Sequence, residues 1–319
     1  MLNNPIVFMF CGQGSQYYHM GRELFNKHPT FQKSMMQMDA IIFKHIGKSI
    51  VNEIYNPHKR VGDKFHPILY THPAIFMLEY SLCQLLLEKG IMPDYLLGSS
   101  LGEFTCAAVS GVMSVEDVID SIVKQAIILE SYCSNGSMIA IIDNPSLYYE
   151  TPQLYENSEL ASVNYHSHFV ISGDNEKLNL IVNFLEKKNI TYHLLPVDYG
   201  FHSSLIDPAE RAYKDFLKTK SYKTPSIPFI SCLLGSRVTE VNSKFLWDVV
   251  RKPIQFQKAI QYLESQHECI YLDLGPSGTL ANFSKQNLSP NSMRRCYSII
   301  TPFNQELKYL KDIECLFQG

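Results

Sequence analysis

The sequence has little of what marks several large classes of protein. It contains one tryptophan, no internal repeat and no low-complexity tract. Its 28 Lys and Arg nearly balance 31 Asp and Glu, and there is no basic run, which argues against nucleic acid as the main partner. None of its eight cysteines forms a C-x-x-C pair or a His/Cys cluster at metal-ligand spacing. We therefore expect no bound metal and no bound cofactor.

Long hydrophobic runs are missing as well. No stretch approaches the roughly 20 apolar residues of a membrane-spanning helix. The first apolar run, Ile6-Val7-Phe8-Met9-Phe10, is too short for a signal peptide, and no basic segment precedes it. Most cysteines lie in apolar runs, which is typical of buried free thiols in a reducing compartment. These absences predict a cytoplasmic protein that does not bind a membrane.

What is present is the composition of a globular enzyme, 45% hydrophobic and 18% charged over 319 residues. That length predicts a large domain with a smaller one inserted or beside it. In residues 1–133 and 199–319, helical patterns alternate with apolar runs, which favours a parallel sheet covered by helices on both faces. Pro73 is predicted to open its helix and Ser114 to cap the next. The strands are predicted near 6–10, 93–97, 228–232, 268–273 and 296–300, and the helices near 17–26, 29–46, 73–89, 115–133, 204–219, 243–251, 254–265, 278–286 and 303–315.

Residues 134–198 have a different pattern of apolar runs. Short apolar runs return quickly, at 138–142, 161–163, 169–172 and 192–196, and one helical pattern near 175–188 lies between the last two. This arrangement predicts a small α+β subdomain inserted into the larger domain.

The stretch Gly98-Ser99-Ser100-Leu101-Gly102 carries the clearest chemical signal. It joins an apolar strand to a helix start and matches the Gly-x-Ser-x-Gly nucleophile elbow, in which flanking glycines permit a strained turn that exposes the serine. The backbone N–H of Leu101, at the start of the helix, would face an oxyanion formed there. A plain strand-to-helix turn is the alternative, because a five-residue pattern also occurs by chance.

A serine hydroxyl needs a base within hydrogen-bond reach. Among eleven histidines, His202 stands out because Tyr199-Gly200-Phe201-His202 follows a predicted strand and precedes a helix. Loops at the carboxyl ends of strands gather the chemistry of open α/β sheets, although spacing alone leaves the choice of His202 open. A second loop, Cys11–Gln16, is either a tight turn or a loop whose N–H groups face Ser100, and it lacks the Lys-Ser/Thr of a P-loop.

Together these segments resemble the malonyl-CoA:acyl carrier protein transacylase family, which includes the acyltransferases of polyketide and fatty acid synthases. The match is collinear over nearly the whole chain, and the free-standing form is similar to discrete acyltransferase homologues of bacterial trans-acyltransferase polyketide pathways. It implies an α/β-hydrolase-like domain over 1–133 and 199–319, with a ferredoxin-like subdomain over 134–198. The matching segments are Gly12-Gln13-Gly14-Ser15-Gln16, Thr71-His72-Pro73-Ala74, Gly98–Glu103, Phe201-His202 and Asp273-Leu274-Gly275-Pro276.

By this resemblance, Ser100 is the nucleophile that becomes acylated and His202 is its base. The N–H groups of Gln13 and Leu101 are implied to form the oxyanion hole, in which one donor typically contributes about 3–4 kcal/mol. The family orients its histidine through a backbone carbonyl, so a Ser–His dyad is implied. A side-chain amide stands four residues before the late proline in the family; here that position is Val249, of which only the carbonyl could serve.

The most informative departure lies twenty-five residues after Ser100. Malonyl-type members carry an arginine there, which pairs with the free carboxylate of the acyl unit, whereas this chain has Gln125. A neutral amide offers donors but no charge. Loss of one partner of a desolvated charge pair costs roughly 2–5 kcal/mol, so malonyl groups are expected to bind poorly. Lys124 lies about 100° away on a helix and is not expected to replace the arginine. The alternative is that another cationic side chain pairs with the acyl carboxylate.

Further departures surround the predicted pocket. Ser99 replaces a family histidine and His72 a glutamine, either as a compensating exchange or as independent substitutions. Asn164 matches a pocket asparagine, and His168 falls where a polar amide is common, although an exposed loop explains it equally well. The residues that we expect to bind substrate are Gln125, Ser99, His72, Asn164 and Phe201.

The resemblance implies that Ser100 takes an acyl group from a thioester on the phosphopantetheine of an acyl carrier protein, or on CoA. Arginine-less relatives include acyl hydrolases that clear blocked carrier proteins, so the leading prediction is a proofreading hydrolase for uncharged acyl chains. The alternatives are transfer of a neutral acyl group (or, less readily, malonyl) from CoA to a carrier protein, a silent docking partner, and a generic esterase with an acid beside His202. We expect a monomer whose partners are acyl carrier protein domains of a polyketide synthase.

Overall fold

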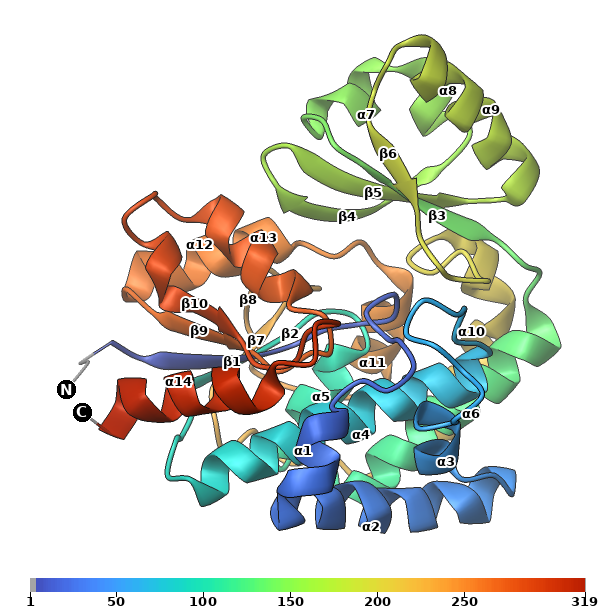
Figure 1. Ribbon diagram of the computed structural model, residues 1–319. Coiled ribbons are helices and arrows are strands. Elements are labelled where there is room, and N and C mark those ends of the chain that lie inside the picture. The colour runs from blue at the N-terminus through green and yellow to red at the C-terminus, as the bar shows by residue number, and fades with distance from the viewer. Residues whose placement is uncertain (1–3, 319) are drawn as a thin grey trace.

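The computed structural model describes residues 4–318 and divides them between two sheets (Figure 1). The larger sheet has six strands, in the order β10 (Cys296–Ser298), β9 (Ile270–Asp273), β1 (Ile6–Phe10), β2 (Tyr95–Gly98), β7 (Phe229–Ser231) and β8 (Ser236–Arg237). All pairs are parallel except the hairpin between β7 and β8. The predicted parallel sheet is therefore confirmed.

The centre of this sheet positions the site. β1 pairs on one side with β2, where Phe10 is opposite Gly98, and on the other side with β9, where Met9 is opposite Asp273. Residues 7–10 of β1 are completely buried, as expected of an apolar strand covered on both faces. Because parallel strands end at the same edge, the loops that follow β1 and β2 lie next to each other.

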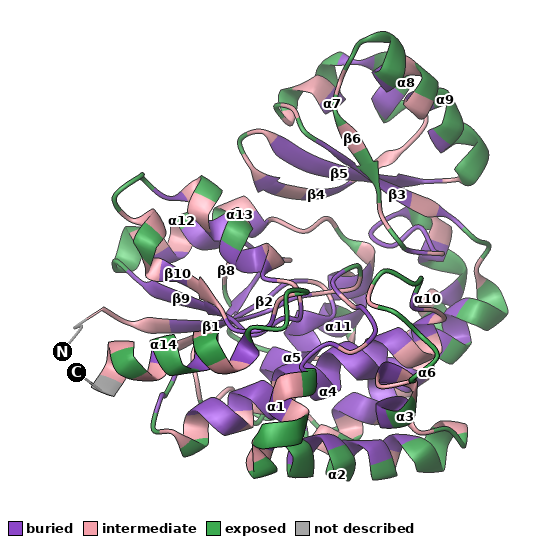
Figure 2. Cartoon of the chain, viewed as in Figure 1, coloured by how far each residue is buried: buried purple, intermediate pink, exposed green. Residues whose placement is uncertain are grey.

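Helices cover both faces of the larger sheet (Figure 1). They are α1 (Arg22–Lys27), α2 (Pro29–Ile46), α3 (Ile50–Ile54), α4 (Ile68–Glu88), α5 (Gly102–Val109), α6 (Val115–Tyr132), α10 (Glu210–Leu217), α11 (Ser243–Arg251), α12 (Phe256–Gln266), α13 (Thr279–Asn287) and α14 (Glu306–Gln318), with short 3-10 helices η1 (Ser204–Ala209) and η2 (Met293–Arg295). Figure 2 shows α4 and α5 almost entirely buried, whereas α2 exposes one side. The reason is that α4 packs against α2, α5 and α6 at once. No helix in the described part of the chain is both long and apolar enough to cross a membrane.

The smaller sheet lies within residues 137–194 and is antiparallel. Its spatial order is β4 (Glu159–Tyr165), β5 (His168–Gly173), β3 (Ser137–Ile141) and β6 (Tyr192–Leu194). Helices α7 (Ser146–Glu150) and α8 (Pro152–Tyr155) join β3 to β4, and α9 (Asn175–Lys187) joins β5 to β6. This is the ferredoxin-like arrangement that the resemblance implies.

Alternation along β3 gives the small sheet two buried faces. Ile139 and Ile141 belong to a separate core with Phe169 and the apolar side of α9. Met138 and Ala140 point the other way and join the main core. The small sheet therefore lies over the large domain with an apolar face, and the space between them is available for a ligand.

Local patterns placed most elements correctly. Helices α2 and α11 have the predicted bounds, and the Ser114 hydroxyl accepts a hydrogen bond from the amide of Asp117 as the predicted cap. The prediction that Pro73 opens its helix is wrong, because α4 begins at Ile68 and contains Pro73. Ile68, Thr71 and His72, which precede Pro73, are buried, so packing extends the helix beyond the point where propensity would end it. Elements α3, α7, α8 and β8 were not predicted.

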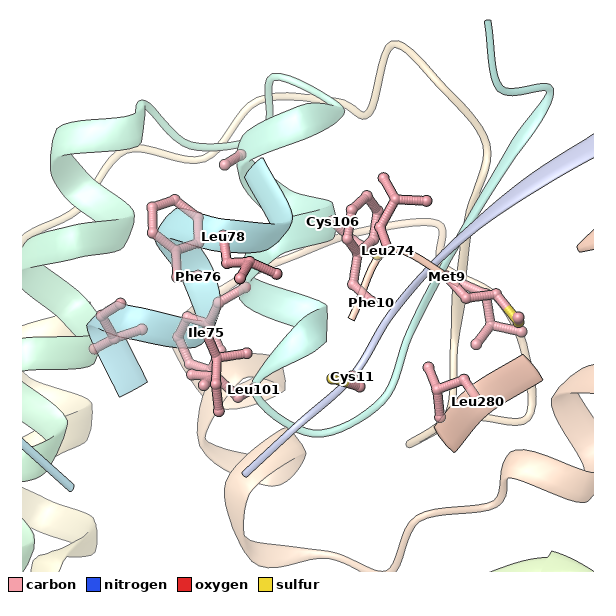
Figure 3. Close-up of a cluster of buried hydrophobic side chains, with 14 of the residues drawn as sticks. Met9, Phe10, Cys11, Ile75, Phe76, Leu78, Leu101, Cys106, Leu274 and Leu280 are labelled. Carbon is pink, nitrogen blue, oxygen red and sulfur yellow. The ribbon is translucent and has the colours of Figure 1, made fainter. Parts of the chain in front are cut away.

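The start of α5 lies directly on the end of β1. Figure 3 shows Phe10, the last residue of this strand, and the following Cys11 among apolar side chains from α4, α5 and α13. Gly102 is the closest point of approach, because a Cβ atom there would lie 2.0 Å from the carbonyl oxygen of Phe10. Only glycine lets the helix after the serine turn contact the central strand at this distance.

We predict that Gly102→Ala destabilises the protein by about 3 kcal/mol or more, because a methyl group would displace rigid backbone. The exposed Gly62 provides a matched control, since nothing lies within 4 Å of its added Cβ. Gly62→Ala is expected to change the free energy of unfolding by less than about 0.5 kcal/mol. Urea unfolding of both variants measures the difference, and equal midpoints would contradict the close approach.

Candidate active site

Ser100 lies at the apex of the turn between β2 and α5. Its φ angle is 55°, in the left-handed region that non-glycine residues rarely adopt. The loop after β1 passes directly beside it, so that a Cβ on Gly12 would lie 2.9 Å from the Cβ of Ser100. This is the strained elbow expected from the Gly-x-Ser-x-Gly pattern, with a second loop packed against it.

His202 also has a left-handed backbone, with a φ angle of 60°. Its Nε2 lies 3.0 Å from Ser100 Oγ, and its Nδ1 lies 2.8 Å from the carbonyl oxygen of Lys252. A carbonyl only accepts, so Nδ1–H donates to Lys252 and Nε2 remains free to accept the Ser100 proton. Among the described residues, no carboxylate forms a hydrogen bond with His202.

The prediction that the carbonyl of Val249 orients His202 is wrong. That group belongs to the body of α11, whereas the chain becomes extended at Lys252, with φ −92° and ψ 158°. The carbonyl of Lys252 thereby leaves the helix direction and reaches the imidazole. The backbone N–H of His202 is held separately by the carbonyl of Val250, at 3.1 Å.

The electrostatic state of His202 suits a base. Burial lowers its pKa from 6.5 to about 4, the hydrogen bond to Lys252 opposes this shift, and the nearby Arg251 adds to it. The imidazole is therefore neutral at pH 7, with Nε2 unprotonated.

Two backbone amides near Ser100 are unused. Within residues 4–318, neither the N–H of Gln13 nor that of Leu101 donates to an acceptor. Leu101 directly follows Ser100 at the helix start, and Gln13 follows Gly12, which contacts Ser100. These are the two positions expected for oxyanion donors.

Two buried carboxyl groups, not singled out from the sequence, hold the loops together. Glu79 on α4 accepts from the Cys11 N–H at 2.6 Å and from the Thr105 hydroxyl at 2.8 Å, so it ties the loop after β1 to α5. Glu103 accepts from the Ser231 hydroxyl at 2.6 Å and from the Leu233 N–H at 2.9 Å, which ties α5 to the end of β7. The signal that could have found Glu79 is a charged residue at a core-facing position of an otherwise apolar helix.

His72 contacts Gln13 in the loop after β1. Burial lowers its pKa to about 4, so the ring is neutral, and its Nε2–H donates to the Gln13 side-chain oxygen at 3.2 Å. Within the described chain no hydrogen bond joins His72 to Ser99, so the compensating exchange considered above is not formed directly. The His72 ring also lies 5.8 Å from that of Phe201.

A cavity of about 320 Å³ opens between Ser100, His202 and the small sheet. The five residues that the sequence predicted to bind substrate all line it: Gln125, Ser99, His72, Asn164 and Phe201. The small sheet contributes Met138, Ala140 and Val170, and Leu195 follows directly after β6. No Lys, Arg, Asp or Glu from residues 4–318 lines the cavity. The alternative that another cationic side chain replaces the family arginine therefore has no support in the structure.

Asn164 and His168 form a self-paired polar wall of this cavity. The Ser162 hydroxyl donates to Asn164 Oδ1 at 2.6 Å, and Asn164 Nδ2 lies 3.0 Å from His168 Nδ1. The interpretation of His168 as an exposed loop residue is wrong, because it lies on β5 and is buried; the neighbouring His166 is exposed. The buried strand pair β4–β5, which overlies α13, accounts for the difference.

Arg251 does not line the cavity and is engaged elsewhere. Arg251 pairs with Asp207, which follows His202 in η1, and with Glu159 on β4 at 3.3 Å. Glu159 also accepts from the Ser204 N–H at 2.7 Å. This cluster connects the small sheet to the His202 loop and leaves no guanidinium in the cavity.

No group of three or more His, Cys, Asp or Glu in residues 4–318 is arranged to hold a metal ion.

Comparison with known proteins agrees with this geometry. The profile of the acyl transferase domain family matches residues 7–310, and the chain belongs to that family. It is 58% identical to "Polyketide biosynthesis acyltransferase homolog PksD" of Bacillus subtilis (strain 168), over 98% of this chain and 97% of the relative. It is 51% identical to "Polyketide biosynthesis acyltransferase homolog BaeD" of Bacillus velezensis, with the same two coverages.

Solved structures show the same fold. The acyltransferase domain from the second module of the salinomycin polyketide synthase superimposes with a TM-score of 0.85 and 25% identity, over 97% of this chain and 72% of that one. FabD from Acinetobacter baumannii superimposes with a TM-score of 0.83 and 22% identity, over 98% and 99%.

We predict that Glu79→Ala lowers the free energy of unfolding by about 3 kcal/mol or more, because it leaves two buried donors unpaired at roughly 1–3 kcal/mol each. Glu79→Gln keeps an acceptor and is the control.

Burial raises the pKa of Glu79 from 4.5 to about 8. The unfolded carboxyl ionises first, so the stability due to Glu79 falls as the pH rises from 4.5 through 8, and the Gln variant should lack this decline. Urea unfolding across that pH range tests both points, and an Ala variant as stable as the parent would contradict the tie.

We also predict that the His202 ring titrates near pH 4 in the folded protein. Proton NMR of the imidazole Cε1–H, assigned by comparison with His202→Asn, measures this pKa. Since the unfolded ring takes up a proton near pH 6.5, the stability due to the neutral ring is lost as the pH falls from 6.5 through 4. A midpoint at 6.5 would show that the ring is not desolvated.

Proposed function

We propose that this protein is a serine acyl hydrolase of polyketide biosynthesis, which removes uncharged acyl groups from the pantetheine arm of acyl carrier proteins. One observation carries the proposal: an intact Ser100–His202 pair opens into a cavity where Gln125 takes the place of an arginine and no charged side chain of the described residues is present. Family membership supports acyl chemistry, and the names of the Bacillus relatives support the polyketide setting.

The geometry suggests how the reaction would run. His202 Nε2 accepts the Ser100 proton while Oγ attacks the thioester carbonyl, and the N–H groups of Gln13 and Leu101 stabilise the oxyanion. The carrier thiol leaves with the proton from His202, and an ester remains on Ser100. His202 then takes a proton from water, whose oxygen attacks the ester. The acid is released, and the proton returns to Ser100 Oγ.

The carbonyl of Lys252 orients His202 in the role that an Asp has in a triad. This favours a Ser–His dyad over a generic esterase, which would place an acid beside the histidine. The left-handed backbone at both Ser100 and His202 supports a catalytic role, because such strain gathers at active sites.

The cavity explains the choice of acyl group. A carboxylate entering it would lose water without gaining a cation, at a cost of roughly 2–5 kcal/mol, which is about 30- to several-thousand-fold in binding. The aliphatic side chains of the small sheet offer apolar contact to an uncharged chain.

We predict that the protein releases free butyrate from butyryl-loaded carrier protein, that Ser100→Ala abolishes this release, and that malonyl-loaded carrier protein reacts at least about 30-fold more slowly. Gln125→Arg should raise malonyl acylation about tenfold or more. Free acid is measured by chromatography and acyl-Ser100 by intact mass.

A second, holo carrier protein in the same reaction separates hydrolysis from transfer. Butyryl transfer to that carrier would replace the hydrolase with a neutral acyltransferase. Malonyl loading without butyryl turnover would overturn both, and the absence of any acyl-Ser100 would favour a silent docking partner.

A further inference from the structure

Gln125 is held in one orientation by a residue outside the cavity. The phenolic O–H of Tyr213 donates to the carbonyl oxygen of Ser121 at 3.1 Å, so the phenolic oxygen is left to accept. Gln125 Nε2 donates to it at 3.2 Å. Tyr213 is fully buried on α10, where its ring packs against those of Phe216 and Trp247, so it is a rigid partner.

This contact decides which end of the amide the cavity receives. Tyr213 does not line the cavity, whereas Gln125 does. An amide is planar and carries its nitrogen and oxygen on opposite sides, so with Nε2 turned toward Tyr213 the group left for the cavity is Oε1. No donor within residues 4–318 forms a hydrogen bond with Oε1, and Gln125 is only 3% exposed.

An acceptor in such a place is sensitive to the ligand. Left unpaired in a desolvated site, a polar atom costs free energy that a ligand donor would recover. A hydroxyl on the acyl chain supplies that donor. A ketone or a carboxylate presents a second acceptor and is repelled by Oε1, and a plain alkyl chain leaves Oε1 unpaired.

Three other polar side chains of the cavity wall are already paired. The Asn164 side-chain oxygen accepts from the Ser162 hydroxyl, and its nitrogen is paired with His168 Nδ1. The Gln13 oxygen is taken by His72.

We propose that the Gln125–Tyr213 pair makes the cavity selective for acyl groups that carry a hydroxyl, over the corresponding keto and unsubstituted acyl groups. The inference rests on the proposed acyl-enzyme function and names its substrate class. Gln125 contacts the acyl chain in this scheme, and Tyr213 is a positioning residue that acts through it.

The test compares kcat/KM for three carrier-protein thioesters of equal chain length: 3-hydroxybutyryl, butyryl and 3-oxobutyryl. A neutral hydrogen bond contributes about 1 kcal/mol, so we expect the hydroxylated substrate to exceed butyryl about fivefold and the keto substrate by more. Tyr213→Phe frees the amide to turn Nε2 into the cavity, and the hydroxy-to-keto ratio should fall about fivefold or more. Gln125→Leu keeps the volume, removes the acceptor and should bring the hydroxy-to-butyryl ratio to about one.

Tyr222→Phe is the matched control. It removes a phenolic hydroxyl that donates to the Leu217 carbonyl at 2.7 Å and that forms no hydrogen bond with Gln125. It should leave both the hydroxy-to-keto and the hydroxy-to-butyryl ratio unchanged. A merely structural role of Tyr213 would lower all three rates together and leave the ratio as it is in the parent.

The outcomes separate the two proposals. If no thioester is lost and no acyl-Ser100 forms, the proposed function fails. If the parent turns over all three substrates equally, and if neither Tyr213→Phe nor Gln125→Leu changes the ratios between them, the inference fails while the function stands. A parent enzyme that prefers the keto substrate would show that Nε2 faces the cavity, which also overturns the inference.

Discussion

The parallel pairing of β1 with β2 is the interaction on which the rest of the site depends. It places Phe10 opposite Gly98, and the Ser99 N–H then donates to the Phe10 carbonyl at 3.0 Å. The chain therefore leaves both strands at one point, where Gly12 passes against Ser100 and Gly102 lies against the strand end. Backbone geometry therefore brings together Ser100 and the loop that carries the free amide of Gln13, before any side chain contributes.

Buried polar groups then keep this arrangement rigid. Glu79 accepts hydrogen bonds from two segments, and Glu103 accepts two from the end of β7. Burial raises the pKa of both carboxyl groups to about 8, because both are removed from water. The same desolvation acts in the opposite direction on His202, because it disfavours the charged imidazole. Burial therefore favours the protonated form of the two acids and the neutral form of His202. Catalytic geometry of this kind needs such a supporting shell, since a misplacement of about 1 Å can cost two orders of magnitude in rate.

The cavity results from the way the small domain alternates its side chains. On β3, Ile139 and Ile141 fill the core of the small domain, whereas Met138 and Ala140 line the cavity that Ser100 also lines. In the wall, Asn164 is paired with Ser162 and His168, and the Arg251 guanidinium is committed to Asp207 and Glu159. Because no charged side chain from residues 4–318 lines the cavity, a charged group entering it would lose water without gaining a partner, so absent groups shape this site as much as present ones.

Local sequence determined the elements and their order: the apolar run of β1, the amphipathic patterns of α2 and α11, the glycine-flanked turn at Ser100 and the short-strand texture of residues 137–194. Periodicity and turn chemistry act between neighbours, so a linear pattern suffices for them. Only the tertiary structure decided that Lys252, and not Val249, orients His202, because that depends on where α11 ends beside a loop 50 residues earlier. It likewise decided that Glu79 joins two loops and that Tyr213, 88 residues from Gln125, sets which atom of the amide faces the cavity. These are hydrogen bonds between segments remote in sequence, and their geometry exists only once packing has brought the segments together.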